Sequence, residues 1–306
     1  MTKIKWTFNN IPDLSGKIII VTGGNSGLGY ESVKAFSMKG AEVILACRNM
    51  DKGEKAKGEI MKLNPTGSIQ VMEIDLMDLS SVKKFADQII QKYSKLDVLL
   101  NNAGIMATPY FQTKDGFEAQ LGTNHLGHFA LTGHLLQLIK ITPNSRVVSV
   151  SSMAHKSGKM NFDNLMFEGG KDFTPFRAYG QSKLSNLLFT YELQRYFEAN
   201  NIDSIAVAAH PGGSNTNLAS HLESKWYFKL LAPIARGAMQ SAAKGALPQI
   251  RAAVDAKVKG AEFYGPDGFN EVFGYPKLVQ STPASHSKED AKRLWEVSEK
   301  LTGVKF

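Results

Sequence analysis

Short apolar runs alternate with longer amphipathic stretches through most of this chain of 306 residues. Runs of this kind are typical of strands, and the stretches between them have the spacing of helices that pack on one side. The predicted strands are 17–22, 42–46, 69–74, 98–100, 146–150, 204–209 and one near 261–264. The alternation predicts an α/β protein with a doubly wound (Rossmann) parallel sheet and helices on both faces.

Helices are predicted in the connections between these strands. The first begins near Tyr30 and ends before Gly40, the second covers 51–63, and the third has Val82, Phe85 and Ile89 on a single face. A long helical region at 115–140, a helix at 179–199 and another from about 241 follow. The last helix is 289–301, and Leu294, Trp295 and Val297 are available to dock it. A chain of this length can bury the core of one large α/β domain. We therefore expect a single domain over residues 1–306.

Composition narrows the class of function. The formal net charge is +8, but Lys and Arg are spread along the chain, which favours a solvated basic surface over a nucleic-acid site. The single cysteine, Cys47, excludes an internal disulfide and fits a reducing compartment. No run is long enough for a membrane span, and the amino terminus lacks the apolar core of a signal peptide. We expect a soluble, cytoplasmic protein.

A glycine-rich turn directly follows the first predicted strand. Residues 22–29 read Thr-Gly-Gly-Asn-Ser-Gly-Leu-Gly, and three of these glycines, Gly23, Gly27 and Gly29, stand where the chain must turn. Without Cβ atoms the backbone turns tightly and lets a pyrophosphate approach amides at the positive end of a helix. This order predicts a site for an anionic cofactor, and an ordinary tight turn is the alternative.

The end of the second strand bears on the choice of dinucleotide. In a doubly wound sheet this end lies beside the adenosine ribose, where an acidic residue binds the 2′-hydroxyl and an arginine accepts a 2′-phosphate. Cys47 occupies the usual acidic position, and Arg48 follows it. We therefore predict NADP(H) as the preferred cofactor and NAD(H) as the alternative. An Arg48 that only points into solvent would remove that preference.

Candidate catalytic side chains follow the fifth strand and open the helix 179–199. Ser151 and Ser152 stand at the carboxyl end of the sheet, where ligands bind in open α/β folds. Tyr179 and Lys183 are four residues apart, which places them on one helical face. A phenol has a pKa of roughly 10, so a neighbouring ammonium that favours phenolate would improve it as an acid-base group at neutral pH.

A pair of histidines, His125 and His128, has a spacing that fits a metal site. The sequence offers no further His, Cys or acidic cluster to complete the ligand set. We therefore interpret both histidines as structural or surface residues and expect no metal.

The order of these elements resembles the short-chain dehydrogenase/reductase family. The matching elements are the glycine turn 22–29, the tetrapeptide Asn-Asn-Ala-Gly at 101–104, Asn124, Ser152, and Tyr179 with Lys183. The resemblance covers residues 15 to 265. Four further segments are similar to the retinol-dehydrogenase-like branch, namely 45–48, 124–129, 151–155 and 210–212.

This resemblance implies hydride transfer between a nicotinamide and a carbonyl or alcohol carbon. Tyr179 is implied to exchange the proton with the substrate oxygen, and Lys183 to lower the tyrosine pKa and bind the nicotinamide ribose. Ser152 is implied to hydrogen-bond the substrate oxygen, with Ser151 as the alternative. Asn124 is implied to hold a water through its backbone carbonyl, at a helix irregularity, as part of a proton relay.

The family pattern also implies a set of cofactor-binding residues. Asp75 would bond the adenine with help from the amide of Leu76, and a helix-capping role is the alternative for this aspartate. Thr216 would contact the carboxamide or the pyrophosphate. The full implied set is Gly23, Asn25, Ser26, Gly27, Leu28, Gly29, Arg48, Asp75, Leu76, Asn102, Ala103, Gly104, Tyr179, Lys183, Pro211, Gly212 and Thr216.

The large apolar residues at 226–234 lie where the family carries a substrate lid. We expect a lid near 213–240 with a greasy pocket wall, and core packing or a subunit contact are the alternatives. A tail rich in Gly and Pro follows near 265–306. The implied substrate is a lipophilic aldehyde, ketone or alcohol, and a homo-oligomer is an implied assembly. The competing function is a non-enzymatic dinucleotide sensor, which would typically lack the Tyr or the Lys.

Overall fold

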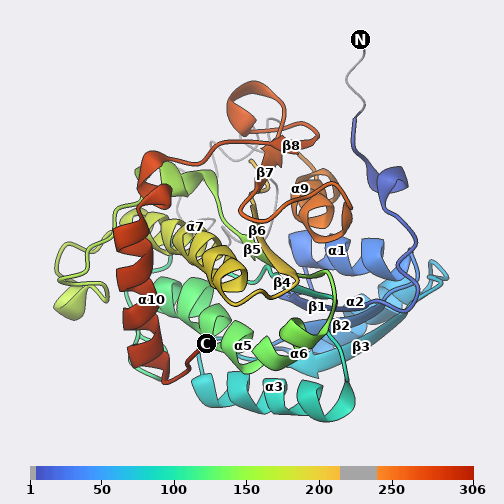
Figure 1. Cartoon of the computed structure of the whole chain (residues 1–306), viewed down its shortest axis with the longest axis horizontal. Coiled ribbons are helices and arrows are strands. Elements are labelled where there is room, and N and C mark those ends of the chain that lie inside the picture. Colours follow the sequence, from blue (N-terminus) through green and yellow to red (C-terminus); the bar gives the residue numbers. More distant parts are fainter. Residues whose placement is uncertain (1–4, 214–239) are drawn as a thin grey trace.

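The computed structural model describes residues 5–213 and 240–306, which form one sheet covered by helices on both faces (Figure 1). The strand order is β3-β2-β1-β4-β5-β6-β7-β8, parallel from β3 to β7 and antiparallel between β7 and β8. The strands are β1 (Ile18–Thr22), β2 (Glu42–Cys47), β3 (Ser68–Glu73), β4 (Val98–Asn101), β5 (Ser145–Val150), β6 (Ser204–Ala209), β7 (Phe263–Pro266) and β8 (Pro276–Leu278). The predicted doubly wound fold is confirmed.

Helices fill the connections, as the periodicity predicts. They are α1 (Gly27–Ser37), α2 (Met50–Met61), α3 (Leu79–Lys92), α4 (Ala119–Leu121), α5 (Gly127–His134), α6 (Leu136–Ile141), α7 (Pro175–Ala199), α9 (Ala242–Val254) and α10 (Lys288–Thr302). The shorter turns are η1 (Phe8–Asn10), η2 (Gly122–Leu126), η3 (Met153–Ser157), η4 (Glu168–Gly170), η6 (Phe269–Glu271) and η7 (Pro283–His286). Among the described helices, none combines the length and apolarity needed to cross a bilayer.

Side chains of each central strand alternate between two hydrophobic cores. Ile19 and Val21 of β1 join the core under α1 and α9, whereas Ile20 joins the core under α3, α5 and α7. This period of two is the geometry of a strand, and burial on both faces explains why the strand is apolar from Ile18 to Val21. The chain leaves β1 toward β2 on one side, while β4 lies on the other side. This switch point is where open α/β sheets bind ligands.

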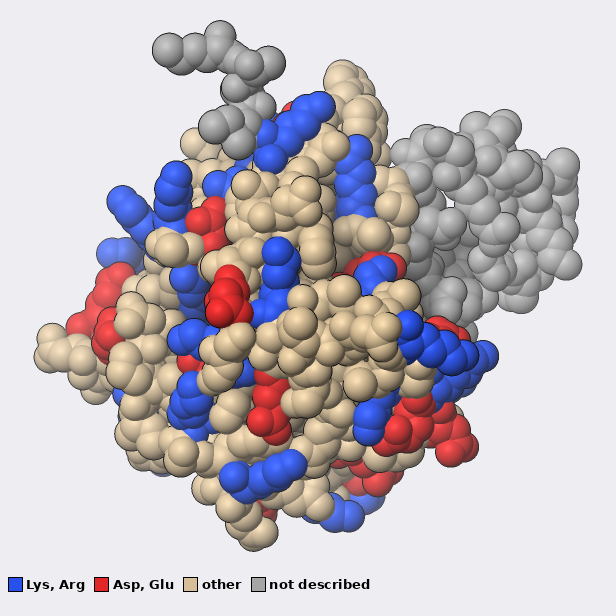
Figure 2. All heavy atoms as spheres, turned by 90° about the vertical axis from the view of Figure 1, so that its right-hand side faces the viewer, with Lys and Arg blue, Asp and Glu red and all other residues tan. Residues whose placement is uncertain are grey.

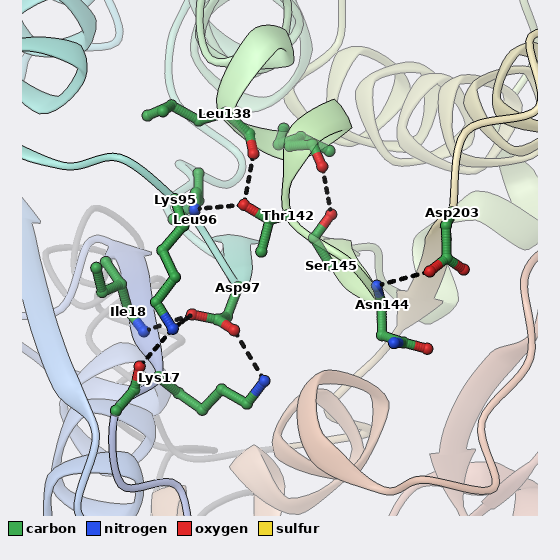
Figure 3. Close-up of polar contacts among 12 residues, drawn as sticks. Lys17, Ile18, Lys95, Leu96, Asp97, Leu138, Thr142, Asn144, Ser145 and Asp203 are labelled. Atoms are coloured by element: carbon green, nitrogen blue, oxygen red, sulfur yellow. Dashed lines mark hydrogen bonds and ion pairs between the residues drawn. The ribbon is translucent and has the colours of Figure 1, made fainter.

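The amino end of the sheet is fixed by a buried carboxylate (Figure 3). Asp97 accepts a hydrogen bond from the Lys17 Nζ at 2.8 Å and from the Ile18 amide at 2.9 Å, and the Lys95 Nζ lies 3.2 Å away. The Thr142 hydroxyl nearby accepts from the Leu96 amide at 2.9 Å. These contacts tie the starts of β1 and β4 together and leave the carboxyl end of the sheet for chemistry.

The structure corrects the bounds of two predicted elements. The helical region expected over 115–140 begins only at α4 and is interrupted, because the π-helical turn η2, in which the Gly127 amide donates to the Gly122 carbonyl, separates α4 from α5, and Leu135 separates α5 from α6. The strand expected near 261–264 begins two residues later, because Ala261 has a positive φ of 60°. The tail then adds β8, which the sequence analysis does not predict.

The C-terminal helix α10 docks on α5 and α7. Leu294 is buried, and the Trp295 ring stacks on Tyr196 and packs against Phe189 and Phe306. On the face in Figure 2, Lys and Arg side chains lie among acidic and uncharged ones rather than in one continuous basic surface. That distribution agrees with a solvated basic surface.

Candidate active site

The glycine-rich turn lies at the carboxyl end of β1, beside the end of β4. Gly23 has a φ of +66°, and a Cβ there would lie 3.1 Å from the Cα of Ala103. A Cβ on Gly29 would overlap the carbonyl oxygen of Gly23. Since α1 begins at Gly27, its first amides have no partner within the helix. The turn, which Asn25, Ser26 and Leu28 complete, therefore has the close backbone geometry that an anion site needs.

The ends of β1 and β4 are joined by a dense hydrogen-bond network. The Thr22 hydroxyl accepts from the amides of Asn102 and Ala103 at 2.9 and 3.0 Å, and the Asn102 side-chain amide donates to the Thr22 carbonyl at 2.7 Å. From α9, the Gln249 Nε2 donates to Asn102 Oδ1 and to Ser32 Oγ, both at 2.9 Å. Gln249 is a supporting residue that sequence reasoning misses, because no motif marks it.

Arg48 stands just beyond β2 and faces the end of β3. Its Nη1 lies 4.0 Å from Asp75 Oδ2, and its side chain is 65% exposed. Asp78, rather than Asp75, caps α3 by accepting from the amides of Ser80 and Ser81, which removes the capping alternative for Asp75. Arg48 and Asp75 line a groove of about 840 Å³. Its other lining residues are Met50, Gln70, Val71, Met72, Glu73, Asp78, Ser80, Ser81, Lys84, Gln88, Gln91 and Lys92.

Tyr179 and Lys183 lie on one face of α7, and both are buried. The Lys183 Nζ lies 5.7 Å from the centre of the Tyr179 ring and donates to the Val150 carbonyl at 3.0 Å. Ser152 hydrogen-bonds Tyr179 through its side chain. Ser151 points elsewhere, because its hydroxyl donates to the Lys183 carbonyl at 2.8 Å. The structure therefore brings Ser152, Tyr179 and Lys183 together and gives Ser151 a structural contact.

Burial dominates the protonation of this pair. It raises the pKa of Tyr179 to about 12 against the lowering effect of the Ser152 hydrogen bond. It also lowers the pKa of Lys183 to about 8, because the charged ammonium is desolvated. The expectation that Lys183 depresses the phenol pKa is therefore not met by these side chains. At neutral pH Tyr179 is a phenol and is ready to donate a proton.

Asn124 lies in η2, at the helix irregularity that the family pattern implies. Its Oδ1 accepts from the Ile105 amide at 2.8 Å, and its Nδ2 donates to the Ile105 carbonyl at 3.0 Å and the Ser182 hydroxyl at 2.9 Å. A Cβ on Gly104 would lie 2.9 Å from Asn124 Oδ1 and 3.5 Å from the Lys183 Nζ. Gly104, Asn124 and Lys183 therefore border the same space.

The turn after β6 is held by a histidine and a glutamate that the sequence analysis does not single out as site residues. The His210 Nδ1 accepts from the Gly212 amide at 3.2 Å, so its Nε2 carries the hydrogen that is donated to Glu271 at 3.0 Å. The Gln240 side chain donates to the Pro211 carbonyl at 2.7 Å. These contacts fix Pro211 and Gly212 beside the β7–β8 hairpin. Thr216 and nearly all of the expected lid, 213–240, lie outside the described residues.

The two histidines of the possible metal pair are buried in separate hydrogen bonds. The His125 Nε2 lies 2.9 Å from the Ser298 hydroxyl of α10. His128 contacts the Thr22 hydroxyl at 2.9 Å and the Asn124 carbonyl at 3.0 Å. Within residues 5–213 and 240–306, no group of three His, Cys, Asp or Glu side chains is arranged to hold a metal ion.

Comparisons with known proteins agree with this arrangement. A sequence model described as short chain dehydrogenase matches residues 17–226. Human retinol dehydrogenase 12 is 36% identical over 296 residues, which is 96% of this chain and 88% of that protein. Human retinol dehydrogenase 11 is also 36% identical, over 95% of this chain and 87% of that protein.

Solved structures show the same fold over most or all of the chain. An uncharacterised protein from Mycobacterium paratuberculosis superposes with a TM-score of 0.83 at 41% identity, covering 99% of both chains. The Pseudomonas aeruginosa RhlG complex with NADP superposes with a TM-score of 0.64 at 21% identity, covering 82% of this chain and 94% of that one. The latter likeness supports the fold alone.

Proposed function

The chain belongs to the short-chain dehydrogenase/reductase family of oxidoreductases, in its retinol-dehydrogenase-like branch, and we propose that it is an NADP(H)-dependent enzyme that transfers a hydride between the nicotinamide and a carbonyl or alcohol group. One observation carries the proposal: Ser152, Tyr179 and Lys183 converge at the carboxyl end of β5, with Asn124 beside them. An acid, a hydrogen-bond donor and an ammonium in one buried space are the parts that carbonyl reduction requires.

The residues present fit a dinucleotide. The turn at Gly23 and Gly29 leaves a backbone cradle that a Cβ would fill, and the first turn of α1 offers amides to a pyrophosphate. When bound, the cofactor supplies or accepts the hydride at its nicotinamide ring. We assign Pro211 and Gly212, whose turn is fixed by hydrogen bonds to His210 and Gln240, to the nicotinamide end of the proposed site.

Arg48 supports the preference for NADP(H). Its guanidinium is mostly exposed beyond β2, and the nearest carboxylate oxygen, on Asp75, lies 4.0 Å away. The side chain is thus placed to form charge-assisted hydrogen bonds with a 2′-phosphate. The buried Cys47 stands where an acid would bind the 2′-hydroxyl of NAD(H), which leaves that ribose without its usual partner.

Tyr179 is placed to act as the proton donor in the reductive direction near neutral pH. Because burial keeps its pKa at about 12, the phenol holds the proton that an alkoxide formed from the carbonyl would take up. Ser152 binds the same substrate oxygen, so that the oxygen is held near the phenol. Oxidation of an alcohol would first need the phenolate.

Aromatic side chains support a lipophilic substrate. Phe111 and Phe176 are exposed although large and apolar, and Phe176 lies three residues before Tyr179 on α7. Tyr110, which precedes Phe111, and Phe173, which lies just before α7, pack edge to face with ring centroids 5.3 Å apart. Apolar groups of this kind favour substrates with long or aromatic chains. The names of the retinol dehydrogenase relatives point the same way.

The test is consumption of reduced cofactor with a panel of aliphatic and aromatic aldehydes, ketones and retinal, run with NADPH and with NADH. We expect turnover of lipophilic carbonyls and a lower KM for NADPH than for NADH. Faster turnover with NADH would overturn the role of Arg48. Tight binding of NADPH with no turnover of any carbonyl would contradict the proposed enzymatic function and favour a non-enzymatic dinucleotide sensor.

A further inference from the structure

We propose that His128 is a positioning residue of this site: its neutral ring, protonated at Nδ1, holds the main-chain carbonyl of Asn124 and ties it to the Thr22 hydroxyl at the end of β1. The ring bridges two elements that are far apart in the sequence, with its Nδ1 3.0 Å from the Asn124 oxygen and its Nε2 2.9 Å from the Thr22 Oγ1. The consequence for catalysis rests on the proposed function, whereas the hydrogen-bond geometry does not.

The direction of each hydrogen bond follows from the chemistry of its partners. A carbonyl oxygen only accepts, so the His128 Nδ1 must carry the hydrogen that points to Asn124. The Thr22 hydroxyl already accepts from the amides of Asn102 and Ala103. Its single hydrogen therefore remains for the His128 Nε2, which is nearer than the alternative acceptor, the Leu100 carbonyl at 3.3 Å.

The surroundings keep this ring neutral. His128 is only 3% exposed, and burial lowers its pKa to about 4, with the Lys183 charge acting in the same direction and the Asn124 hydrogen bond opposing it. A second proton would sit on Nε2 and would meet the Thr22 hydroxyl, which would then have to rotate and give up its donor role. One tautomer therefore satisfies both ring nitrogens at neutral pH.

The Asn124 carbonyl stands at an irregular point of the helix. It lies in η2, where the π-helical turn breaks the regular ladder of main-chain hydrogen bonds. The Asn124 side chain is fixed by Ile105 and Ser182, and the imidazole adds a hydrogen bond to the main-chain carbonyl of the same residue. This hydrogen bond orients the carbonyl that would hold a water in the proposed proton relay.

Thr22 connects this carbonyl to the cofactor side of the site. The same hydroxyl that donates to His128 receives the amides of Asn102 and Ala103, and Ala103 borders Gly23 of the glycine turn. A displacement of the glycine turn would therefore be passed through two hydrogen bonds to the relay carbonyl. His128 thus couples the dinucleotide site to the proton path.

Two substitutions separate the two halves of the bridge. His128→Asn places a side-chain amide near the position of Nδ1 and can still donate to the Asn124 carbonyl, although it cannot reach Thr22. His128→Gln extends toward Thr22 but lacks the Nδ1 donor. We expect His128→Gln to lower kcat for carbonyl reduction by about tenfold, as expected for a buried acceptor that loses its donor, and to raise the solvent deuterium isotope effect while the KM for NADPH stays unchanged.

His128→Asn, in contrast to His128→Gln, should keep most of the wild-type kcat and a solvent isotope effect close to that of the wild type. The matched control is His125→Asn, at a buried histidine of the same helical turn whose Nε2 contacts Ser298; the shorter side chain loses this contact and should lower stability without changing kcat. Equal losses in kcat for His128→Asn and His128→Gln, or an isotope effect that does not change, would overturn the positioning role.

A second measurement is independent of activity. Nitrogen NMR of the wild-type protein with labelled histidine, in which the His128 signals are those lost in His128→Asn, should show a neutral ring protonated at Nδ1 near pH 7. Protonation at Nε2, or a charged ring, would overturn the proposal whatever the turnover. An Nδ1-protonated ring in a protein that binds NADPH but reduces no carbonyl would instead support the bridge and reject the proposed enzyme.

Discussion

The Lys183 Nζ donates a hydrogen bond at 3.0 Å to the carbonyl oxygen of Val150, the last residue of β5. This contact fixes the ammonium at the carboxyl end of the central sheet. A carbonyl partner brings no negative charge, so burial lowers the pKa of Lys183 to about 8. Lys183 therefore changes its charge near physiological pH.

The first prediction concerns pH. Lys183 is charged below a pKa of about 8 and loses its charge above it, whereas Tyr179 keeps its proton up to a pKa of about 12. The kcat/KM for NADPH-dependent reduction should be flat on the acidic side and fall as pH rises through about 8. Alcohol oxidation should gain from rising pH, because it needs the phenolate. A reduction profile that rises from about pH 7 to about pH 10 would contradict the assignment of roles.

The second prediction concerns the cofactor preference. Arg48→Ala removes a mostly exposed side chain, so the fold should keep its stability. The KM for NADPH should rise roughly tenfold or more, because a hydrogen bond to a charged group contributes about 1.5–3 kcal/mol. The KM for NADH is the internal control and should change little. Equal losses with both cofactors would show that Arg48 does not read the 2′-phosphate.

The third prediction concerns the tie between the β7–β8 hairpin and the turn after β6. The His210 hydrogen bond lowers the pKa of Glu271 although burial acts against it, and the Lys156 charge assists. Glu271→Gln keeps the shape and removes the charge, so Pro211 and Gly212 should be held less firmly. We expect the KM for NADPH to rise about tenfold while kcat changes little.

Glu289→Gln, an exposed position at the start of α10, is the matched control for that variant and should leave the KM unchanged. In the wild-type protein, cofactor affinity should also weaken in acid, as pH falls through the lowered pKa of Glu271. An unchanged KM for NADPH in Glu271→Gln would show that the hairpin does not support the cofactor site.

The fourth prediction concerns stability. The Asp97 side chain is only 7% exposed, and this burial acts to raise its pKa. Hydrogen bonds from Lys17, the Ile18 amide and Lys95 outweigh burial, so that the Asp97 pKa is lowered. Asp97→Asn should reduce the free energy of unfolding by about 2–3 kcal/mol near neutral pH. Because the folded-state pKa is depressed, this contribution is present above the unfolded value of about 3.9 and is lost as pH falls through the folded value.

Urea unfolding of Asp97→Asn and wild type at neutral and acidic pH measures this difference. Asp203→Asn is the control, because its carboxylate makes a longer contact of 3.3 Å with the exposed Asn144 amide (Figure 3). A gap between Asp97→Asn and wild type that stays constant down to about pH 3 would contradict the ion-pair explanation.

The local sequence pattern predicts those structural features that depend only on residues close together in the sequence. The strand at 204–209 has the bounds expected from its apolar run, and Tyr179 and Lys183 share a face because four residues make about one helical turn. The glycine turn likewise lies between a strand and a helix, since its glycines meet a steric demand that is visible in the sequence.

Contacts between segments that are far apart in the sequence cannot be predicted from the local sequence pattern. Gln249 reaches Asn102 across 147 positions, and His210 reaches Glu271 across 61. The raised pKa of Tyr179 also depends on burial that only the folded chain creates, so spacing alone predicts the wrong direction. The family pattern implies the helix irregularity at Asn124, but the π-helical turn that forms it is defined only by the folded main chain.

The most direct test of the central claim compares Tyr179→Phe with the wild type in two measurements, NADPH binding and NADPH-dependent reduction of a lipophilic aldehyde. The substitution removes one hydroxyl from a buried ring and leaves the cofactor cradle intact. We expect unchanged binding and a loss of turnover of at least about a hundredfold. Turnover close to that of the wild type would contradict Tyr179 as the proton donor and, with it, the proposed reaction at this site.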